Sequence, residues 1–116
     1  MLPAIEAHTF NQEVLRSNIP VLVSFWAPWC RVCRWVEPLL HNLQLRSASA
    51  FKIVSVNADT NLHLASCYKV INIPSLLLFD RGQLVERIDH FGSQAEAQQL
   101  LECALDQIAR SQLSTG

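Results

Sequence analysis

Two cysteines separated by two residues, Cys30 and Cys33, are the side chains of this sequence best suited to covalent chemistry. They follow an apolar, β-prone run, Val21–Trp26, and open a helical pattern. At the start of a helix, unpaired backbone amides and the positive end of the helix dipole favour an anion. The thiolate is the reactive form of cysteine, so this position suits Cys30 as a nucleophile.

The spacing of the pair predicts thiol–disulfide exchange. Cys33 is expected one helical turn beyond Cys30, more shielded and close enough to close a disulfide. This arrangement suits an attacking Cys30 and a resolving Cys33. Arg31 and Arg34 stand on either side of Cys33, and their positive charge further favours a thiolate at Cys30.

Two other interpretations of the pair stay open. The cysteines could be unrelated core residues, although the strand-to-helix context and the flanking charges argue against this. A metal site needs more ligands, and the sequence has no second CxxC motif. Its histidines are scattered, at His8, His41, His63 and His90. An iron–sulfur cluster shared between two chains is the rarer alternative. We therefore expect neither a metal nor another bound cofactor.

Composition predicts one globular domain over residues 1–116. Half of the 116 residues are hydrophobic (50%), enough for a packed core. A formal charge of −1 gives no basic field for nucleic acid and no polybasic membrane patch. The N-terminus lacks a secretory pattern, and no apolar run reaches the length of a membrane span. We expect a cytoplasmic monomer that binds neither nucleic acid nor membrane.

Two further cysteines, Cys67 and Cys103, lie on helical patterns. Without a secretory signal, a structural disulfide framework is not expected. We interpret both as inert small apolar fillers, since only exposed and readily ionised thiols are reactive enough for regulation.

Hydrophobic spacing predicts the elements before and after the pair. A short edge strand is expected around residues 4–7, and Thr9 with Gln12 forms a capping box for a first helix. Val21–Trp26 is apolar enough for a strand buried on both faces. The helix that opens at Cys30 should run to about residue 46, with a kink at Pro38.

The second half of the chain reads as strands and shorter helices. Residues 51–57 form a strand, and Asn61 caps a short helix. Residues 75–80 and 83–88 form a hairpin with a turn at Arg81 and Gly82. Ser93 caps the last helix, whose buried stripe is expected to be Ala97, Leu100, Leu101, Ala104, Leu105 and Ile108. The order β-α-β-α-β-α-β-β-α predicts an α/β fold, a central mixed sheet flanked by helices.

With the segment WAPWCRVCRWVEP in place, the chain resembles the thioredoxin family, whose usual segment reads WAxWCGPCK with a proline a few residues later. The likeness covers nearly the whole chain. It implies a thioredoxin fold and reversible dithiol–disulfide exchange with protein substrates, with no bound cofactor. A reductase or another thiol donor would supply electrons.

The resemblance also implies a groove where extended substrate segments dock beside the cysteines. Ile73 and Pro74 resemble the cis-proline loop of the family, and Gly92 matches the glycine before its final helix. Trp29, beside Cys30, would form another edge of this groove.

The chain departs from the family pattern in its tuning residues. Arg31 and Val32 replace glycine and proline between the cysteines, and we hypothesise a less reducing potential than that of a typical thioredoxin. Ser24 and Ser55 stand where the family has a buried aspartate and often its lysine partner. The aspartate helps proton transfer at the resolving cysteine. Ser24 cannot act as a base, so we expect slower resolution, with water or a substrate group taking the proton.

The sequence therefore predicts a disulfide oxidoreductase. A non-enzymatic module, in which the same pair senses redox state and switches a protein interaction in the same groove, is the alternative.

Overall fold

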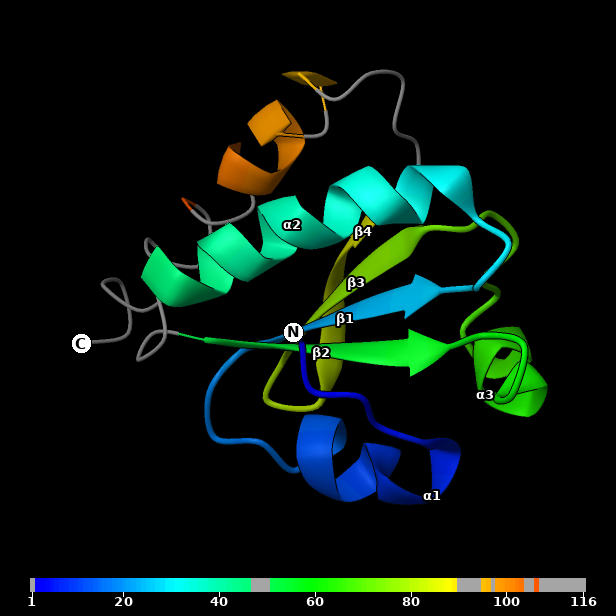
Figure 1. Cartoon of the computed structure of the whole chain (residues 1–116). Helices are drawn as coiled ribbons and strands as arrows, with labels where there is room; N and C mark the ends of the chain where they lie inside the picture. Colours follow the sequence, from blue (N-terminus) through cyan, green and yellow to red (C-terminus); the bar gives the residue numbers. More distant parts are fainter. Residues whose placement is uncertain (1, 47–50, 90–94, 97, 104–105, 107–116) are drawn as a thin grey trace.

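A four-stranded mixed sheet in the order β2-β1-β3-β4 forms the centre of the protein (Figure 1). It is seen in a computed structural model that describes residues 2–46, 51–89, 95–96, 98–103 and 106. The strands are β1 (Val21–Trp26), β2 (Lys52–Asn57), β3 (Ser75–Asp80) and β4 (Gln83–Ile88). The helical elements are α1 (Ala7–Phe10), the π-helical η1 (Asn11–Leu15), α2 (Arg31–Arg46) and α3 (Leu62–Cys67).

Strand β1 lies inside the sheet and pairs on both sides. It runs parallel to β2, which places Ser24 opposite Ser55, and antiparallel to β3, which also pairs antiparallel with β4. The parallel pair needs a crossover, which α2 supplies. The predicted mixed sheet flanked by helices is confirmed.

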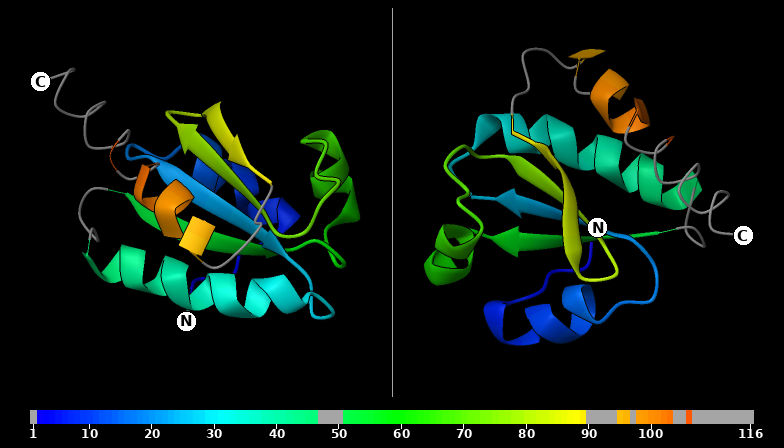
Figure 2. Two further views of the ribbon diagram at one scale, coloured as in Figure 1. Left: turned by 90° about the horizontal axis from the view of Figure 1, so that it is seen from above. Right: turned by 180° about the vertical axis from the view of Figure 1, so that it is seen from behind.

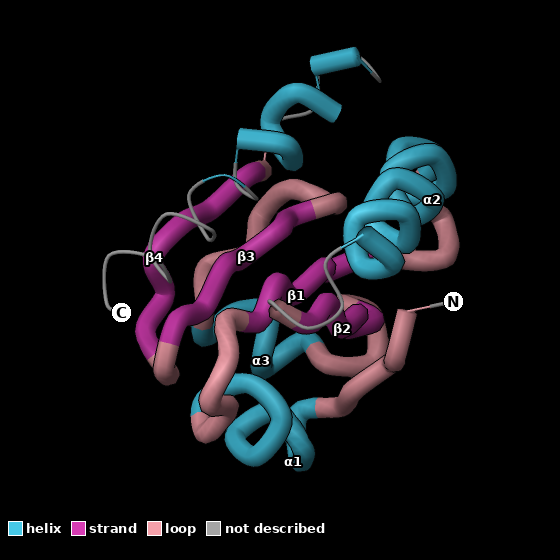
Figure 3. The backbone as a smooth tube through the Cα atoms, turned by 90° about the vertical axis from the view of Figure 1, so that its left-hand side faces the viewer, coloured by secondary structure: helices cyan, strands magenta, loops and turns pink. Residues whose placement is uncertain are grey.

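Helices cover both faces of the sheet (Figures 2 and 3). On one face, Leu22 of β1 belongs to a buried cluster with Leu40 of α2. On the other, Phe25 belongs to a cluster with Val14 of η1 and Leu64 of α3. Because side chains alternate along a strand, β1 needs apolar residues at nearly every position. By the same alternation Ser24 faces α2.

The N-terminal segment forms less regular structure than its sequence suggests. Instead of an edge strand it makes a single bridge between Ala4 and Ser55, in which the Ile5 amide donates to the Ser55 carbonyl at 2.9 Å. The first helix begins at Ala7, before Thr9, so the predicted Thr9 cap is wrong. Thr9 lies in the first turn, where its hydroxyl accepts a hydrogen bond from the Glu6 amide at 3.2 Å.

Asn61 precedes α3 as predicted, but its side chain does not cap that helix. Its Oδ1 accepts a hydrogen bond from the Ala7 amide at 2.8 Å. Its Nδ2 donates to the Glu6 carboxylate and to the Asn57 carbonyl, both at 2.9 Å. A buried amide needs partners for both of its ends, and here those partners tie the N-terminal segment to the end of β2.

Helix α2 runs through Pro38 without interruption, and a kink there stays a prediction. Residues 98–103 are helical and bury Leu101 in the cluster under α2. Leu100 is 40% exposed, so its predicted burial is wrong. Gly92 and Ser93 lie outside the described residues, as do the remaining stripe positions, 97, 104, 105 and 108. Within the described part of the chain, every helix is too short or too polar to cross a membrane.

The turn between β3 and β4 is the predicted one. Arg81 and Gly82 both have positive φ, 54° and 84°, as the turns that suit two-residue hairpins require. A Cβ on Gly82 would lie 2.7 Å from the Leu15 carbonyl oxygen. Glycine is therefore needed both for its conformation and for the close approach of η1.

Gly82→Ala should lower the free energy of unfolding by about 2–4 kcal/mol, the sum of left-handed strain and a backbone clash. Urea unfolding measures the loss. Arg81→Gly is the matched control, since it changes the other left-handed residue without adding an atom, and should stay within about 1 kcal/mol of wild type. Equal stabilities of the wild type and Gly82→Ala would contradict the clash.

Candidate active site

The junction between β1 and α2 positions the two cysteines. After β1 ends at Trp26, the Cys30 amide donates to the Ala27 carbonyl at 3.1 Å and closes a tight turn. Helix α2 begins one residue later, at Arg31. Cys30 therefore stands directly at the N-terminus of a 16-residue helix, and Cys33 lies in its first turn.

Both cysteines are free thiols and both are buried. Cys30 is 5% exposed and Cys33 is 8% exposed. The Cys33 amide donates to the Cys30 sulfur at 3.2 Å. The Cys30 thiol in turn lies 3.6 Å from the Ile73 carbonyl oxygen. An amide directed at the sulfur satisfies one of the unpaired donors of the helix start and stabilises negative charge there.

Cys33 is held in its neutral form. Burial, followed by the hydrogen bond with Cys30, raises the pKa of the Cys33 thiol to about 12. Roughly one Cys33 side chain in 10⁵ is then ionised at neutral pH. The two thiols therefore lie in different environments. The Cys30 sulfur accepts a hydrogen bond from a helix amide, whereas the Cys33 sulfur is buried on the side of α2 that faces the sheet.

Two of the predicted groove residues, Trp29 and Ile73, lie beside Cys30. The Ile73–Pro74 peptide bond is cis, as the resemblance implied. Ile73 packs against the small cluster that contains both cysteines. Trp29 is 65% exposed, and its indole N–H lies 3.1 and 3.2 Å from the two carboxylate oxygens of Asp59. The fourth predicted edge, Gly92, lies outside the described residues.

Asp59 had not been predicted at the site. It follows β2 by two residues, and β2 runs parallel to β1. The carboxyl ends of parallel strands meet at one edge of a sheet, so this position could have been expected near Trp29. Its carboxylate fixes the exposed indole beside Cys30.

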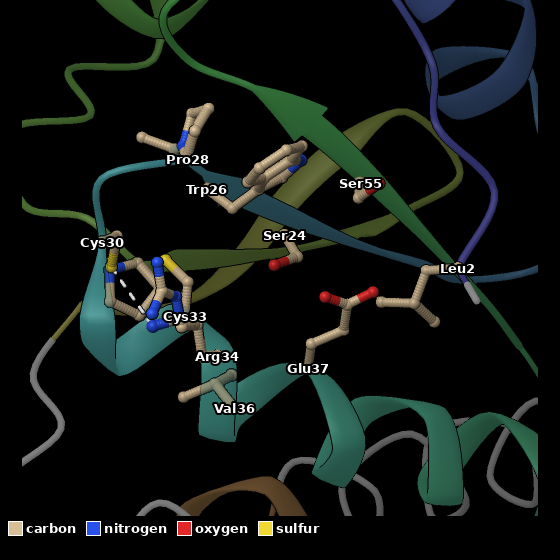
Figure 4. Close-up of a pocket in the computed structure, with 12 residues that line it drawn as sticks. Leu2, Ser24, Trp26, Pro28, Cys30, Cys33, Arg34, Val36, Glu37 and Ser55 are labelled. Atoms are coloured by element: carbon tan, nitrogen blue, oxygen red, sulfur yellow. Dashed lines mark hydrogen bonds between the residues drawn. The ribbon is translucent and has the colours of Figure 1, made fainter.

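A cavity of about 160 Å³ lies beneath Cys33, between α2 and the sheet (Figure 4). Ser24 and Ser55 contribute hydroxyl groups from the sheet, and Arg34 and Glu37 contribute charged groups from α2. Glu37 is a second residue that the sequence reasoning missed. It follows Cys33 by four residues, the spacing that places two side chains on one face of a helix.

The residues predicted to tune the potential and the proton transfer of the cysteine pair lie in different positions around it. Arg31 and Arg34 are exposed, while Val32 is half-buried and packs beside the cysteines. Ser24 is only 5% exposed. The Ser55 hydroxyl donates to the Pro3 carbonyl at 3.4 Å, so this serine also holds the N-terminal bridge.

A family model described as thioredoxin matches residues 2–105. The chain belongs to the thioredoxin family. Thioredoxin 1 of Synechococcus elongatus is 46% identical over 85 residues, which cover 73% of this chain and 79% of that protein. A thioredoxin of Mycobacterium tuberculosis is 42% identical over 80 residues, 69% of each chain. With its close cysteine pair, the chain is a thioredoxin-like thiol–disulfide oxidoreductase.

The two remaining cysteines of this thioredoxin are exposed, so their interpretation as buried fillers is wrong. The Cys67 sulfur lies 3.6 Å from His63 Nε2, one turn away on α3. In the part of the chain that the structure describes, no three histidine, cysteine or carboxylate side chains gather as metal ligands do.

The reduced thioredoxin should lose stability as the pH rises above 9. Folding raises the pKa of Cys33 from 9.0 to about 12, so between these values the unfolded chain releases a proton that the folded protein keeps. Unfolding becomes easier, and the contribution of Cys33 is about 1 kcal/mol between pH 9 and 10. Urea unfolding of the reduced wild type and of Cys33→Ala measures it. The same pH slope in both proteins would contradict the assignment.

Proposed function

We propose that Cys30 is the nucleophile and Cys33 the resolving thiol in the reduction of protein disulfides. The observation that carries this assignment is the Cys33 amide directed at the Cys30 sulfur at 3.2 Å. It favours charge on Cys30, whereas burial keeps Cys33 protonated. The thiolate is the attacking form, so the first attack belongs to Cys30.

The reaction has two displacements. The Cys30 thiolate attacks one sulfur of a substrate disulfide, forms a mixed disulfide and releases the first substrate thiolate. Cys33 then loses its proton and attacks the Cys30 sulfur. The Cys30–Cys33 disulfide forms, the bond to the substrate breaks, and the second substrate thiolate leaves. The substrate gains two electrons, and the cysteine pair supplies them.

The groove around Cys30 suits an extended substrate segment. Trp29 offers an exposed apolar surface that Asp59 holds in place, and Ile73 offers backbone next to the cysteine. Pro74, together with Gly92, completes the groove in this proposal. A reductase or another thiol donor would restore the dithiol by approaching the same face.

Reduction of insulin with dithiothreitol as donor, and then with a thioredoxin reductase, tests this function. Cys30→Ser should reduce turnover to the uncatalysed rate because it removes the attacking sulfur. Cys33→Ser should accumulate a mixed disulfide on Cys30, visible by mass spectrometry. Cys67→Ser is the matched control and should keep full turnover. Absence of turnover with either donor, combined with partner binding that depends on redox state, would favour the sensor instead.

The residues between the cysteines should make the pair more oxidising than that of a typical thioredoxin. Arg31 is exposed at the first position of α2, beside a sulfur that already accepts a backbone hydrogen bond. Positive charge there stabilises the reduced, anionic state. A more stable reduced form means a higher potential.

Equilibration with glutathione should give a potential above about −270 mV, the value typical of thioredoxin. The double substitution Arg31→Gly with Val32→Pro should lower it by about 30 mV or more, which corresponds to about 1.4 kcal/mol. Arg46→Gly, at the far end of α2, serves as a control for loss of charge. A wild-type value of −270 mV or below would defeat the hypothesis.

A further inference from the structure

The second displacement requires the buried Cys33 thiol to release a proton into the cavity beneath it. Ser24 and Ser55 line this cavity, but a hydroxyl does not accept a proton permanently near neutral pH. Arg34 lines it too and stays protonated. Among the described residues that line the cavity, Glu37 is the one that can take up the proton.

The placement of Glu37 fits this task. It lies one turn after Cys33 on α2, and its carboxylate points across the cavity toward Ser24 of β1 (Figure 4). The Ser24 hydroxyl points from the sheet into the space between the cysteines and Glu37 (Figure 4). Glu37 is exposed overall, so its side chain is also in contact with solvent. A proton received on the cavity side can therefore leave to the outside.

The space between the sulfur and the carboxylate suits a relay. The cavity has a volume of about 160 Å³, well above the roughly 10–15 Å³ that one water needs on the same measure. Hydroxyl groups of Ser24 and Ser55 give such water the polar partners it needs. One bridging water is enough for a general base to act at a distance.

We propose that Glu37 accepts the proton of Cys33, through water held by Ser24, when the mixed disulfide is resolved. This inference rests on the proposed function, since it concerns the second displacement of that reaction. The S–H bond of Cys33 breaks, its electron pair forms the bond to the Cys30 sulfur, and the proton passes to the Glu37 carboxylate. The bond between Cys30 and the substrate sulfur breaks at the same time, and its electron pair leaves with the substrate thiolate. Glu37 then returns it to the leaving substrate thiolate or to solvent.

Few of the described residues around the proposed proton path from Cys33 to Glu37 carry a charge. From α2 it faces Arg34, and from the junction with β1 it faces the two thiols. The described sheet residues that line it, Ser24, Trp26 and Ser55, are uncharged. Among the described residues that line the cavity, Arg34 is therefore the cationic one and Glu37 the carboxylate.

Cys67 and Cys103 are exposed thiols that would also react with the probe, so every variant carries Cys67→Ser and Cys103→Ser. In this background, single-turnover oxidation of the reduced protein by excess 4,4′-dithiodipyridine separates the two displacements. The probe is uncharged and releases one coloured thiopyridone on attack by Cys30 and a second on resolution by Cys33. The first phase depends on probe concentration, whereas the second does not.

Glu37→Gln should slow the second phase at pH 7 by about tenfold or more and leave the first within about twofold. Glu37→Asp should retain most of the rate. Ser24→Asp placed in the Glu37→Gln background should restore it, because a carboxylate then reaches the cavity from the strand. Glu86→Gln removes the same charge on β4 and should change neither phase.

Three results would overturn the inference. One is a second phase in Glu37→Gln within about twofold of wild type. Another is an equal slowing of both phases, which indicates a packing role. The third is failure of Ser24→Asp to restore the rate. Release of only one thiopyridone by the protein that carries Cys67→Ser and Cys103→Ser with Glu37 intact is a separate outcome, which would reject the proposed function itself together with the role of Glu37.

Discussion

Burial of the Cys33 thiol between α2 and the sheet is the constraint on which the site depends. Burial keeps the Cys33 sulfur protonated, while the Cys30 sulfur, at the helix start, accepts a hydrogen bond from a backbone amide. In the proposed reaction, the burial that keeps Cys33 from attacking substrate first also makes its deprotonation costly. The fold must therefore provide a route for one proton out of an apolar interior.

The polar sheet residues that line the cavity under Cys33 carry hydroxyl groups instead of charged groups. Ser24 and Ser55 lie opposite each other on parallel strands, and both line the cavity under Cys33. A charged group at the buried Ser24 position would need a counter-ion or access to water, because an unpaired buried charge costs several kcal/mol. Two hydroxyls avoid that cost and leave a polar space. The carboxylate that can serve this space is Glu37, whose side chain stays in contact with solvent and needs no buried counter-ion.

The N-terminal segment shows why the local pattern was less informative away from the pair. Its short elements are determined by long-range partners, the Ser55 backbone and the Asn61 side chain. Asn61 carries a good helix-cap side chain, yet three hydrogen bonds with more distant groups compete successfully for it. Such competition is invisible in local spacing, because the partners lie on other elements.

The sequence by itself determined the strand, the turn and the helix around Cys30, because hydrophobic periodicity and the motif act over neighbouring residues. It also determined the hairpin at Gly82, whose conformation few other residues adopt. Only the tertiary structure decided which groups meet the cysteines from outside that segment. Asp59 reaches Trp29 because β1 and β2 are parallel, and Glu37 and Ser24 line one cavity because α2 packs on their face of the sheet. Spacing along the chain places Asp59 after β2 and Glu37 on the helix face of Cys33, but which groups they meet depends on how the elements pack through space.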